Sequence, residues 1–200
     1  MRYDNLDVIA PHVMGDNYRF NEAEVLGSAV WLWMHSASHR EAPLHMLSAL
    51  LLPAIKNRQF VLASEDTKPI FYMSWARLSL DAERRYLYNP PQCMPVGDWA
   101  SGERLWFLDW IAPFGHSRCM RTLLSHRLFP GWYARSLYHR GEEKRLRIMS
   151  FHGLAVTPQE ARFWFEHNPP AVSPCQENNA SRQPLPDHLQ QEAWSANGGI

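Results

Sequence analysis

Cysteine is scarce and unpatterned in this chain, which argues against the roles in which cysteines work together. The three cysteines, Cys93, Cys119 and Cys175, are an odd number and form no CxxC pair. They predict neither a disulfide framework nor a zinc site, and they favour a reducing compartment. His35 and His39 have the spacing of helical metal ligands, but no acidic residue completes that pattern. No metal is therefore expected.

Net charge and long apolar runs are also missing. The 20 basic and 20 acidic residues cancel, and a chain without positive net charge is a poor candidate for non-specific nucleic-acid binding. The most apolar stretch, residues 44–55, is interrupted by Pro53, whereas a membrane-spanning helix needs roughly 20 apolar residues. Residues 1–16 have no apolar segment, so neither a signal peptide nor a transit peptide is expected. We expect a soluble cytoplasmic protein that binds no nucleic acid and does not insert stably into membranes.

Hydrophobic residues are plentiful and divide the chain into regions. They make up 46% of the 200 residues, which is enough for one compact domain, expected over residues 21–168. Residues 1–20 lack clear periodicity and are expected to form an N-terminal arm. Residues 169–200 are rich in Pro, Ser, Asn and Gln, and they are expected to be a disordered tail because they bury too little apolar surface. The nine tryptophans indicate large apolar contacts, in the core or in a homodimer interface.

Periodicity, caps and turn residues predict mixed secondary structure. The first expected helix covers 21–33, and a second begins at Pro43 and is kinked or ended by Pro53. A hairpin of 59–64 and 70–78, a short helix over 80–87 and a strand that ends at Pro113 are expected next. The remaining expected elements are a helix from 117 to 128, a hairpin of 133–139 and 144–151 that turns at Gly141, and a helix that follows 157. Such elements around one sheet rich in antiparallel pairs predict an α/β or α+β sandwich.

Two helix starts carry specific expectations. Asn21 is expected to cap the first helix through its side chain. Thr157 and Glu160 have the spacing of a capping box, in which each side chain satisfies the backbone N–H of the other. The helix that follows is expected to turn Phe163 and Trp164 toward the core.

The strand that precedes Pro113 carries a carboxylate among large apolar side chains. By alternation Phe107 and Ile111 share a face, and Asp109 falls on that face. Burying a carboxylate is costly unless it is paired or protonated, and functional sites often provide such a pairing. The alternative is an aspartate at a strand end that bonds nearby backbone. The pattern alone leaves both interpretations open.

A histidine lies in the loop between the first two expected helices, in the segment from Ser36 to Arg40. Loops held by a scaffold often carry catalytic residues, and histidine readily serves as acid or base. With 10 histidines in the chain, His39 is equally compatible with a solvated loop position. Ser38 and Cys119 are conceivable nucleophiles, but Cys119 has the spacing of a core residue, and no covalent catalysis is expected.

Several segments occur together in a characteristic order. They are Val25-Leu-Gly-Ser-Ala-Val-Trp-Leu-Trp33, Ser38-His-Arg40, Leu52-Pro-Ala-Ile55, Ser74-Trp-Ala-Arg-Leu-Ser-Leu80, Asp98-Trp-Ala-Ser-Gly-Glu-Arg104, Phe107-Leu-Asp-Trp-Ile-Ala-Pro-Phe-Gly115 and Phe151-His-Gly153. Over roughly residues 25–168 the chain closely resembles the lysine acyltransferases that activate RTX toxins. The segment 107–115 is highly specific for that family. One departure is Leu50, where the family pattern has a polar asparagine.

The resemblance implies a GNAT-like fold and a defined reaction. A fatty acyl group would pass from acyl carrier protein to internal lysines of an inactive RTX protoxin. The essential histidine of the family falls on His39, and its essential aspartate falls on Asp109. The protein would bind no cofactor of its own, because the phosphopantetheine belongs to the carrier protein. Two alternatives stay open: a GNAT-like enzyme that acylates another protein or an amine, and a non-enzymatic protoxin chaperone.

Amide formation from a thioester suits this pair of residues. A lysine with a pKa of about 10.4 is neutral only about once in several thousand molecules at pH 7, so a positioned base is worth about 10²–10⁴-fold. His39 can be that base while Asp109 orients and stabilises the imidazolium. The reverse allocation, with Asp109 as base and His39 polarising the carbonyl, uses the same residues and is equally compatible with the sequence.

The turn before the helix expected at 117 is a candidate for binding the donor, because helix N-termini offer backbone N–H groups. It lacks the glycine-rich pattern typical of coenzyme A sites, which favours a carrier-protein donor. The candidate donor-binding residues are Ser36, Arg40, Gly115, His116, Ser117, Arg118 and Arg121. Arg118 and Arg121 could also take part in a docking patch for an acidic carrier protein. The other basic residues of that patch would be Arg135, Arg140, Lys144, Arg145 and Arg147. The alternative is an ordinary solvated face, because Glu142 and Glu143 are interleaved. Ser117 is also expected to cap its helix.

Overall fold

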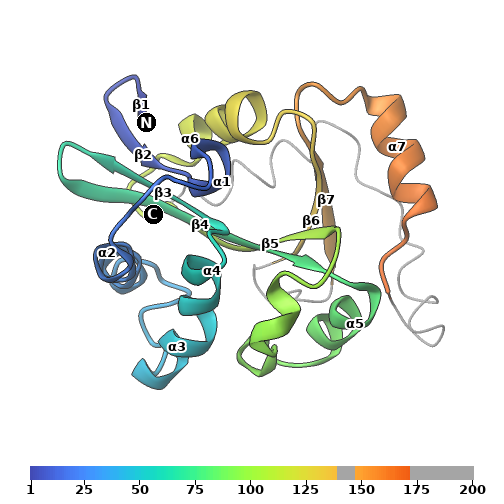
Figure 1. The fold of residues 1–200 in the computed structure, drawn as a ribbon, viewed down its shortest axis with the longest axis horizontal. Coiled ribbons are helices and arrows are strands. Elements are labelled where there is room, and N and C mark those ends of the chain that lie inside the picture. The colour runs from blue at the N-terminus through green and yellow to red at the C-terminus, as the bar shows by residue number, and fades with distance from the viewer. Residues whose placement is uncertain (139–146, 172–200) are drawn as a thin grey trace.

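A single twisted sheet runs through the computed structural model, which describes residues 1–138 and 147–171 (Figure 1). Within these residues the strands lie in sequence order from β1 to β7. They are β1 (Arg2–Tyr3), β2 (Leu6–Ile9), β3 (Phe60–Glu65), β4 (Lys68–Leu78), β5 (Arg104–Ile111), β6 (Tyr133–Leu137) and β7 (Ile148–His152). All neighbouring strands are antiparallel except β5 and β6, which are parallel.

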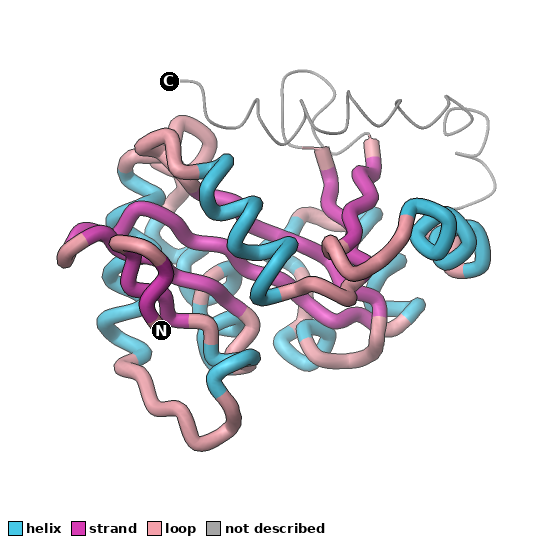
Figure 2. Tube along the Cα trace, turned by 90° about the horizontal axis from the view of Figure 1, so that it is seen from above, coloured by secondary structure: helices cyan, strands magenta, loops and turns pink. Residues whose placement is uncertain are grey.

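Helices cover both faces of this sheet, as the view from above also shows (Figure 2). One face carries α1 (Pro11–Met14), α6 (Ser117–Leu123) and the π-helical turn η4 (Leu124–Leu128). The other carries α2 (Glu22–Met34), η1 (Leu44–Met46), α3 (Leu47–Leu50), α4 (Leu52–Lys56), α5 (Leu80–Tyr88), η2 (Pro91–Cys93) and η3 (Val96–Trp99). Side-chain alternation along β3 builds both layers, since Val61 packs with the first set and Leu62 with the second. The expected mixed architecture around an antiparallel-rich sheet is confirmed.

The first residues of the chain belong to the sheet, which differs from the expected arm. Strand β2 pairs with β3 from Leu6 opposite Glu65 to Ile9 opposite Leu62. Leu6 and Val8 are buried against the sheet core. A strand of four residues shows only two inward positions, which is too short an alternation to be recognised from the sequence.

The N-terminus of α2 is capped as expected. The side-chain oxygen of Asn21 accepts hydrogen bonds from the backbone N–H groups of Ala23 and Glu24. The chain between Pro43 and Lys56 is broken into η1, α3 and α4, and Pro53 lies in the first turn of α4. Proline fits a first helical turn because its missing N–H would have no partner there.

The last helix, α7 (Pro158–His167), lies beside the hairpin of β6 and β7 (Figure 1). Its predicted capping box between Thr157 and Glu160 is confirmed. Trp164 stacks on Tyr133 with ring centroids 4.8 Å apart. Phe163 is 63% exposed, so its expected place in the core is wrong. The side chain lies one position away from the stripe that meets β6, and it packs on His167 of the same helix instead.

Two further expectations reach beyond the described residues. The turn at Gly141 lies outside them, although the flanking strands pair as a hairpin from Tyr133 opposite His152 to Leu137 opposite Ile148. The expected tail also lies outside them from residue 172 on. Its first residues are described and are held in place, because the backbone N–H of Ala171 donates to the carboxylate of Glu83.

Candidate active site

A β-bulge in β5 determines where Asp109 points. Ser74 on β4 is opposite Asp109, and the next residue, Trp75, is opposite Phe107. Leu108 is therefore the extra residue on β5, and side chains before and after it lose their common alternation. Phe107 packs in the core beneath α6, whereas Ile111 packs with α2 on the other face. The expected shared face of Phe107 and Asp109 is wrong, because simple alternation cannot anticipate a bulge.

The pairing between strands β5 and β6 ends just before Asp109. Their parallel pairing consists of Trp106 opposite Arg135 and Phe107 opposite Ser136. The bulge at Leu108 follows at once on the β5 side. Backbone groups of β5 beyond Phe107 are not paired with β6, and Asp109 lies two residues beyond that last pair.

His39 comes from the turn that follows α2. Backbone hydrogen bonds to the carbonyl of Ser36 from the N–H groups of His39 and Arg40 shape this turn. The Oγ of Ser36 lies 2.8 Å from His39 Nδ1, and the Oγ of Ser38 lies 3.2 Å from the same nitrogen. The indole of Trp33 lies beside the imidazole, with ring centroids 5.0 Å apart. These contacts fix the orientation of the ring and leave Nε2 directed away from the turn.

The structure brings His39 and Asp109 together. His39 Nε2 lies 3.5 Å from Asp109 Oδ1, and the two side chains are 22% and 15% exposed. The hydroxyl of Ser74, a fully buried residue, donates to Asp109 Oδ2 over 2.8 Å. Asp109 thus has one oxygen anchored inside the sheet and the other facing the imidazole.

Ser74 is a site residue that the sequence reasoning missed. It lies in the otherwise apolar run of β4, and a hydroxyl there is the signal that could have drawn attention to it. Its partner is set by the register of β4 against β5. That register includes the bulge, so the contact could not be assigned from the sequence.

The pair can transfer a proton at the surface of the protein. A hydroxyl at Nδ1 can donate or accept, so the Ser36 contact accommodates either tautomer of His39. A carboxylate near Nε2 stabilises an imidazolium once it forms. The partial exposure of both side chains allows a second molecule to reach them, which is a requirement for acid–base work on a substrate.

The candidate donor-binding turn lies against the end of α2. Phe114 packs on Trp31 and His35, with ring centroids 5.5 and 5.4 Å apart. Gly115 follows with φ of 83°, a conformation that glycine adopts without strain. His116 Nε2 lies 3.9 Å from the carboxylate of Glu65. The β5–α6 turn is thereby fixed over the helix whose end leads to His39.

Ser117 does not cap α6, so that prediction is wrong. The N-cap residue is His116, without a side-chain cap. Ser117 is buried, and its hydroxyl oxygen accepts from the indole N–H of Trp110 over 2.8 Å. The bulge turns Trp110 toward the face of the sheet that carries α6, where its indole N–H occupies the Ser117 hydroxyl. Arg40 is exposed and pairs with its neighbour Glu41 at 3.3 Å.

The proposed basic docking patch is only partly assembled. Arg118 is exposed and Arg121 is half-buried on α6. Arg147 lies over the ring of Tyr138, 4.4 Å from its centroid. The remaining arginines and lysine of the 139–146 segment, which are Arg140, Lys144 and Arg145, lie outside the described residues.

Arg135 does not belong to any docking surface. It is 2% exposed, it lies near the carboxylate of Glu83, and it donates to the carbonyl of Asn168. Burial lowers its pKa to about 10. Strand β6 turns this side chain inward beneath α7, where Trp164 flanks the guanidinium. A sequence pattern that shows only charge could not distinguish it from the exposed arginines.

Among the described residues, the cysteines and the acidic residues give no sign of other chemistry. Burial raises the pKa of the half-buried Cys119, so its thiol is less readily ionised. Within residues 1–138 and 147–171 no cluster of His, Cys, Asp and Glu is suited to hold a metal ion. No helix in this same part of the chain is long and apolar enough to cross a membrane.

Comparisons with known proteins show the family of the chain. Residues 18–152 match the family model described as the RTX toxin acyltransferase family. The chain belongs to this family. The resemblance predicted from the segments between Val25 and Gly153 is therefore confirmed.

Similar relatives of this family member come from several bacteria. The protein-lysine myristoyltransferase RtxC of Kingella kingae is 41% identical over 139 residues, which are 63% of this chain and 83% of the relative. The RTX-I toxin-activating lysine-acyltransferase ApxIC of Actinobacillus pleuropneumoniae is 40% identical over 68% of this chain and 77% of its own. The protein-lysine myristoyltransferase HlyC of Escherichia coli is 37% identical over 72% and 83%.

Proposed function

We propose that this acyltransferase activates an RTX protoxin by moving a fatty acyl group from acyl carrier protein to internal lysines of that protein. The observation that carries the proposal is the contact between His39 and Asp109, 3.5 Å apart on a chain of the RTX toxin acyltransferase family. The names of the relatives, which are lysine acyltransferases and myristoyltransferases, support the same reaction.

In the proposed mechanism His39 is the base. A lysine of the protoxin approaches the exposed edge of the imidazole, and its nitrogen attacks the carbonyl carbon of the thioester. His39 takes the amine proton as the C–N bond forms, and Asp109 stabilises the resulting imidazolium. The C–S bond then breaks, and the imidazolium returns the proton to the departing thiolate. The products are an acyl-lysine and the thiol of the carrier's phosphopantetheine.

The allocation of base to His39 and not to Asp109 is supported by the contacts of the carboxylate. One oxygen of Asp109 already accepts from the buried Ser74, and the carboxylate is less exposed than the imidazole. A base must reach the proton that it removes. His39 is the better placed of the two, while Asp109 is placed to orient it.

The donor and the setting are part of the same proposal. The turn with Gly115 and His116 lies over α2 and would receive the phosphopantetheine arm, with exposed Arg118 contacting the acidic carrier. The protein would bind no cofactor of its own and would work in the cytoplasm. The GNAT-like character of the fold and a homodimer stay predictions. Leu50 packs at the edge of the cluster around α2, where an apolar side chain in place of asparagine would alter contacts to the donor.

The test is intact-mass analysis of a candidate RTX protoxin after incubation with fatty-acyl carrier protein. Wild-type protein is expected to add one or more acyl groups, and Asp109→Asn is expected to add none. An unmodified protoxin that still binds the protein would contradict the enzyme and leave a chaperone. Acylation of other proteins or amines, with the protoxin unmodified, would contradict the substrate.

A further inference from the structure

Tyr72 has a buried hydroxyl without a partner. The residue lies on β4, it is fully buried, and its hydroxyl has no hydrogen-bond partner among the described residues. Leaving such a group unpaired reduces the stability of the fold, and a phenylalanine of nearly the same shape would avoid that loss. An orphaned polar group in a packed core therefore requires an explanation, and a functional role is one of the established ones.

The register of the sheet places this hydroxyl on the side of Asp109. Tyr72 is opposite Ile111, and Ser74 is opposite Asp109, so the four side chains form one patch on the face that carries α2. Diagonal neighbours in such a patch lie within reach of an aromatic side chain. Strands β4 and β5 run side by side through the middle of the sheet above α2 (Figure 1).

Donor and acceptor in this patch complement one another. Asp109 Oδ2 accepts from Ser74, and the contact of Oδ1 among the described residues is the imidazole of His39, at a distance of 3.5 Å. Tyr72 has a hydroxyl hydrogen and no acceptor. Burial, followed by the charge of Asp109, raises the pKa of Tyr72 well above its usual value. The phenol therefore stays protonated and can serve as a donor at any pH at which the protein works.

We propose that Tyr72 is a positioning residue for Asp109, whose hydroxyl donates to the carboxylate when acyl donor and protoxin lysine close the site around His39. The inference rests on the proposed function, because it concerns the same histidine–aspartate pair. A donor at Asp109 holds the carboxylate ionised and aimed at Nε2 during proton transfer. Hydrogen bonds at active sites often tighten only when substrate is bound, which accounts for the unpaired hydroxyl in the protein alone.

Tyr72→Phe tests this role without changing the packing. Losing a hydrogen bond to a charged group predicts a fall in kcat of at least about tenfold, with KM for both substrates nearly unchanged. Among the described residues, the titratable groups that the structure places against Asp109 are His39 and Tyr72 itself. Because the ionised carboxylate loses a donor, the acid limb of the pH–rate profile should move to higher pH. The melting temperature should stay the same or rise, because an unpaired buried hydroxyl has been removed.

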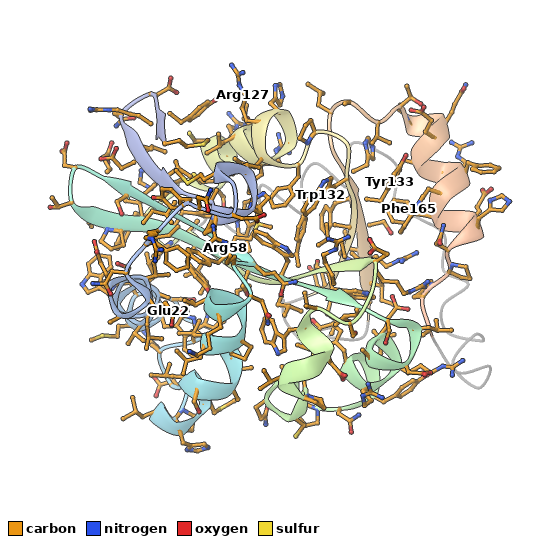
Figure 3. All side chains as sticks on the ribbon, in the orientation of Figure 1. Glu22, Arg58, Arg127, Trp132, Tyr133 and Phe165 are labelled. Carbon is orange, nitrogen blue, oxygen red and sulfur yellow. The ribbon has the colours of Figure 1, made fainter. Side chains whose placement is uncertain are left out.

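Tyr133→Phe is the matched control, because Tyr133 lies on β6 against α7, on the opposite side of the view from Glu22, where α2 begins (Figure 3). It should leave kcat and the pH profile unchanged. An unchanged profile and kcat in Tyr72→Phe, with a higher melting temperature, would overturn the inference. A lower kcat with an unmoved acid limb would also overturn it, since the hydroxyl would then act elsewhere than on the carboxylate.

The same experiment separates this inference from the proposed function. Wild-type protein and Asp109→Asn are assayed in parallel with acyl carrier protein and protoxin. No acyl transfer by the wild type would defeat the proposed function itself. Transfer by the wild type and its loss in Asp109→Asn, with Tyr72→Phe as active as the wild type, would defeat only the role of Tyr72.

Discussion

Two carboxylates in this protein, Glu83 and Asp109, differ in their burial and in their hydrogen bonds. Glu83 on α5 is fully buried, and both of its oxygens accept hydrogen bonds. The donors are Arg104 over 2.6 Å, the indole of Trp106 over 2.7 Å and the backbone N–H of Ala171 over 3.0 Å. Asp109 on β5 is less buried and has one short bond, from Ser74, and one long contact, to His39.

The two carboxylates differ more in the number of their hydrogen bonds than in their burial. A buried charge whose two oxygens both accept hydrogen bonds holds elements together, and Glu83 links α5, β5, β6 and the segment after α7. A carboxylate with an oxygen left for a mobile partner can respond to a substrate. Burial and charge alone would therefore have pointed to Glu83, whereas the proposed mechanism uses Asp109.

Asp109→Asn should give the largest effect and the clearest contrast. The amide keeps the shape but cannot stabilise an imidazolium, so acyl transfer should fall by about 10³–10⁴-fold, as expected when the orienting acid of a His–Asp pair is lost. The melting temperature should change little. Single-turnover acylation measured by mass spectrometry checks this, and Asp66→Asn in the exposed β3–β4 turn serves as the control. A melting temperature that falls as steeply as the activity would remove the contrast with Glu83.

Glu83→Gln should show the opposite profile. Removing the charge leaves Arg104 and the buried Arg135 without their shared partner, which should reduce the free energy of unfolding by about 3–5 kcal/mol. Chemical denaturation monitored by tryptophan fluorescence measures this change. The folded fraction should retain acyl transfer. If activity per folded molecule falls as far as in Asp109→Asn, then Glu83 also acts on the reaction.

His12 extends the comparison to a titratable ring that is buried without a charged partner among the described residues. The ring is stacked on Phe129 and edge-on to Trp75, and within the described residues neither ring nitrogen has a hydrogen bond that meets normal geometry. Burial lowers its pKa to about 4, against a smaller opposing effect of the Leu128 backbone. Because the folded form binds its proton less readily than the unfolded chain, stability is full above about pH 6.5 and falls as the pH drops toward 4.

The expected loss from His12 between pH 7 and pH 5 is about 2 kcal/mol. Unfolding measured at both pH values, in the wild type and in His12→Phe, isolates this contribution. The phenylalanine variant should lose that part of the pH dependence, because its ring fits the aromatic surroundings without titrating. The same pH dependence in both proteins would show that other groups cause it.

Ser74→Ala should give the smallest effect among the variants expected to slow acyl transfer, and it tests whether the Ser74 hydroxyl orients Asp109. The hydroxyl orients the carboxylate from inside the sheet, so its loss should lower kcat by about tenfold, the value of one hydrogen bond to a charged group. Ser125→Ala, which removes a hydroxyl from η4 bound to a helix carbonyl, is the matched control. Full activity in Ser74→Ala would leave His39 as the residue that orients Asp109.

Local signals in the sequence predicted much of the fold. The cap at Asn21, the capping box at Thr157 and the β3–β4 hairpin follow from residues close together in the chain, and the structure confirms them. Failures occurred where a distant partner overrode the local preference. Ser117 is engaged by Trp110 instead of capping its helix, and the N-terminal residues become a strand only because β3 is there to pair with them.

The sequence by itself determined the family and the candidate pair of residues, because the specific motifs around His39 and Asp109 consist of residues that are neighbours in the chain. Only the tertiary structure decided how the pair is built. The bulge at Leu108 sets the face on which Asp109 lies, and the strand register supplies Ser74 and Tyr72. The physical reason is that a register and a bulge are properties of two paired strands, and the pattern along either strand alone does not contain them.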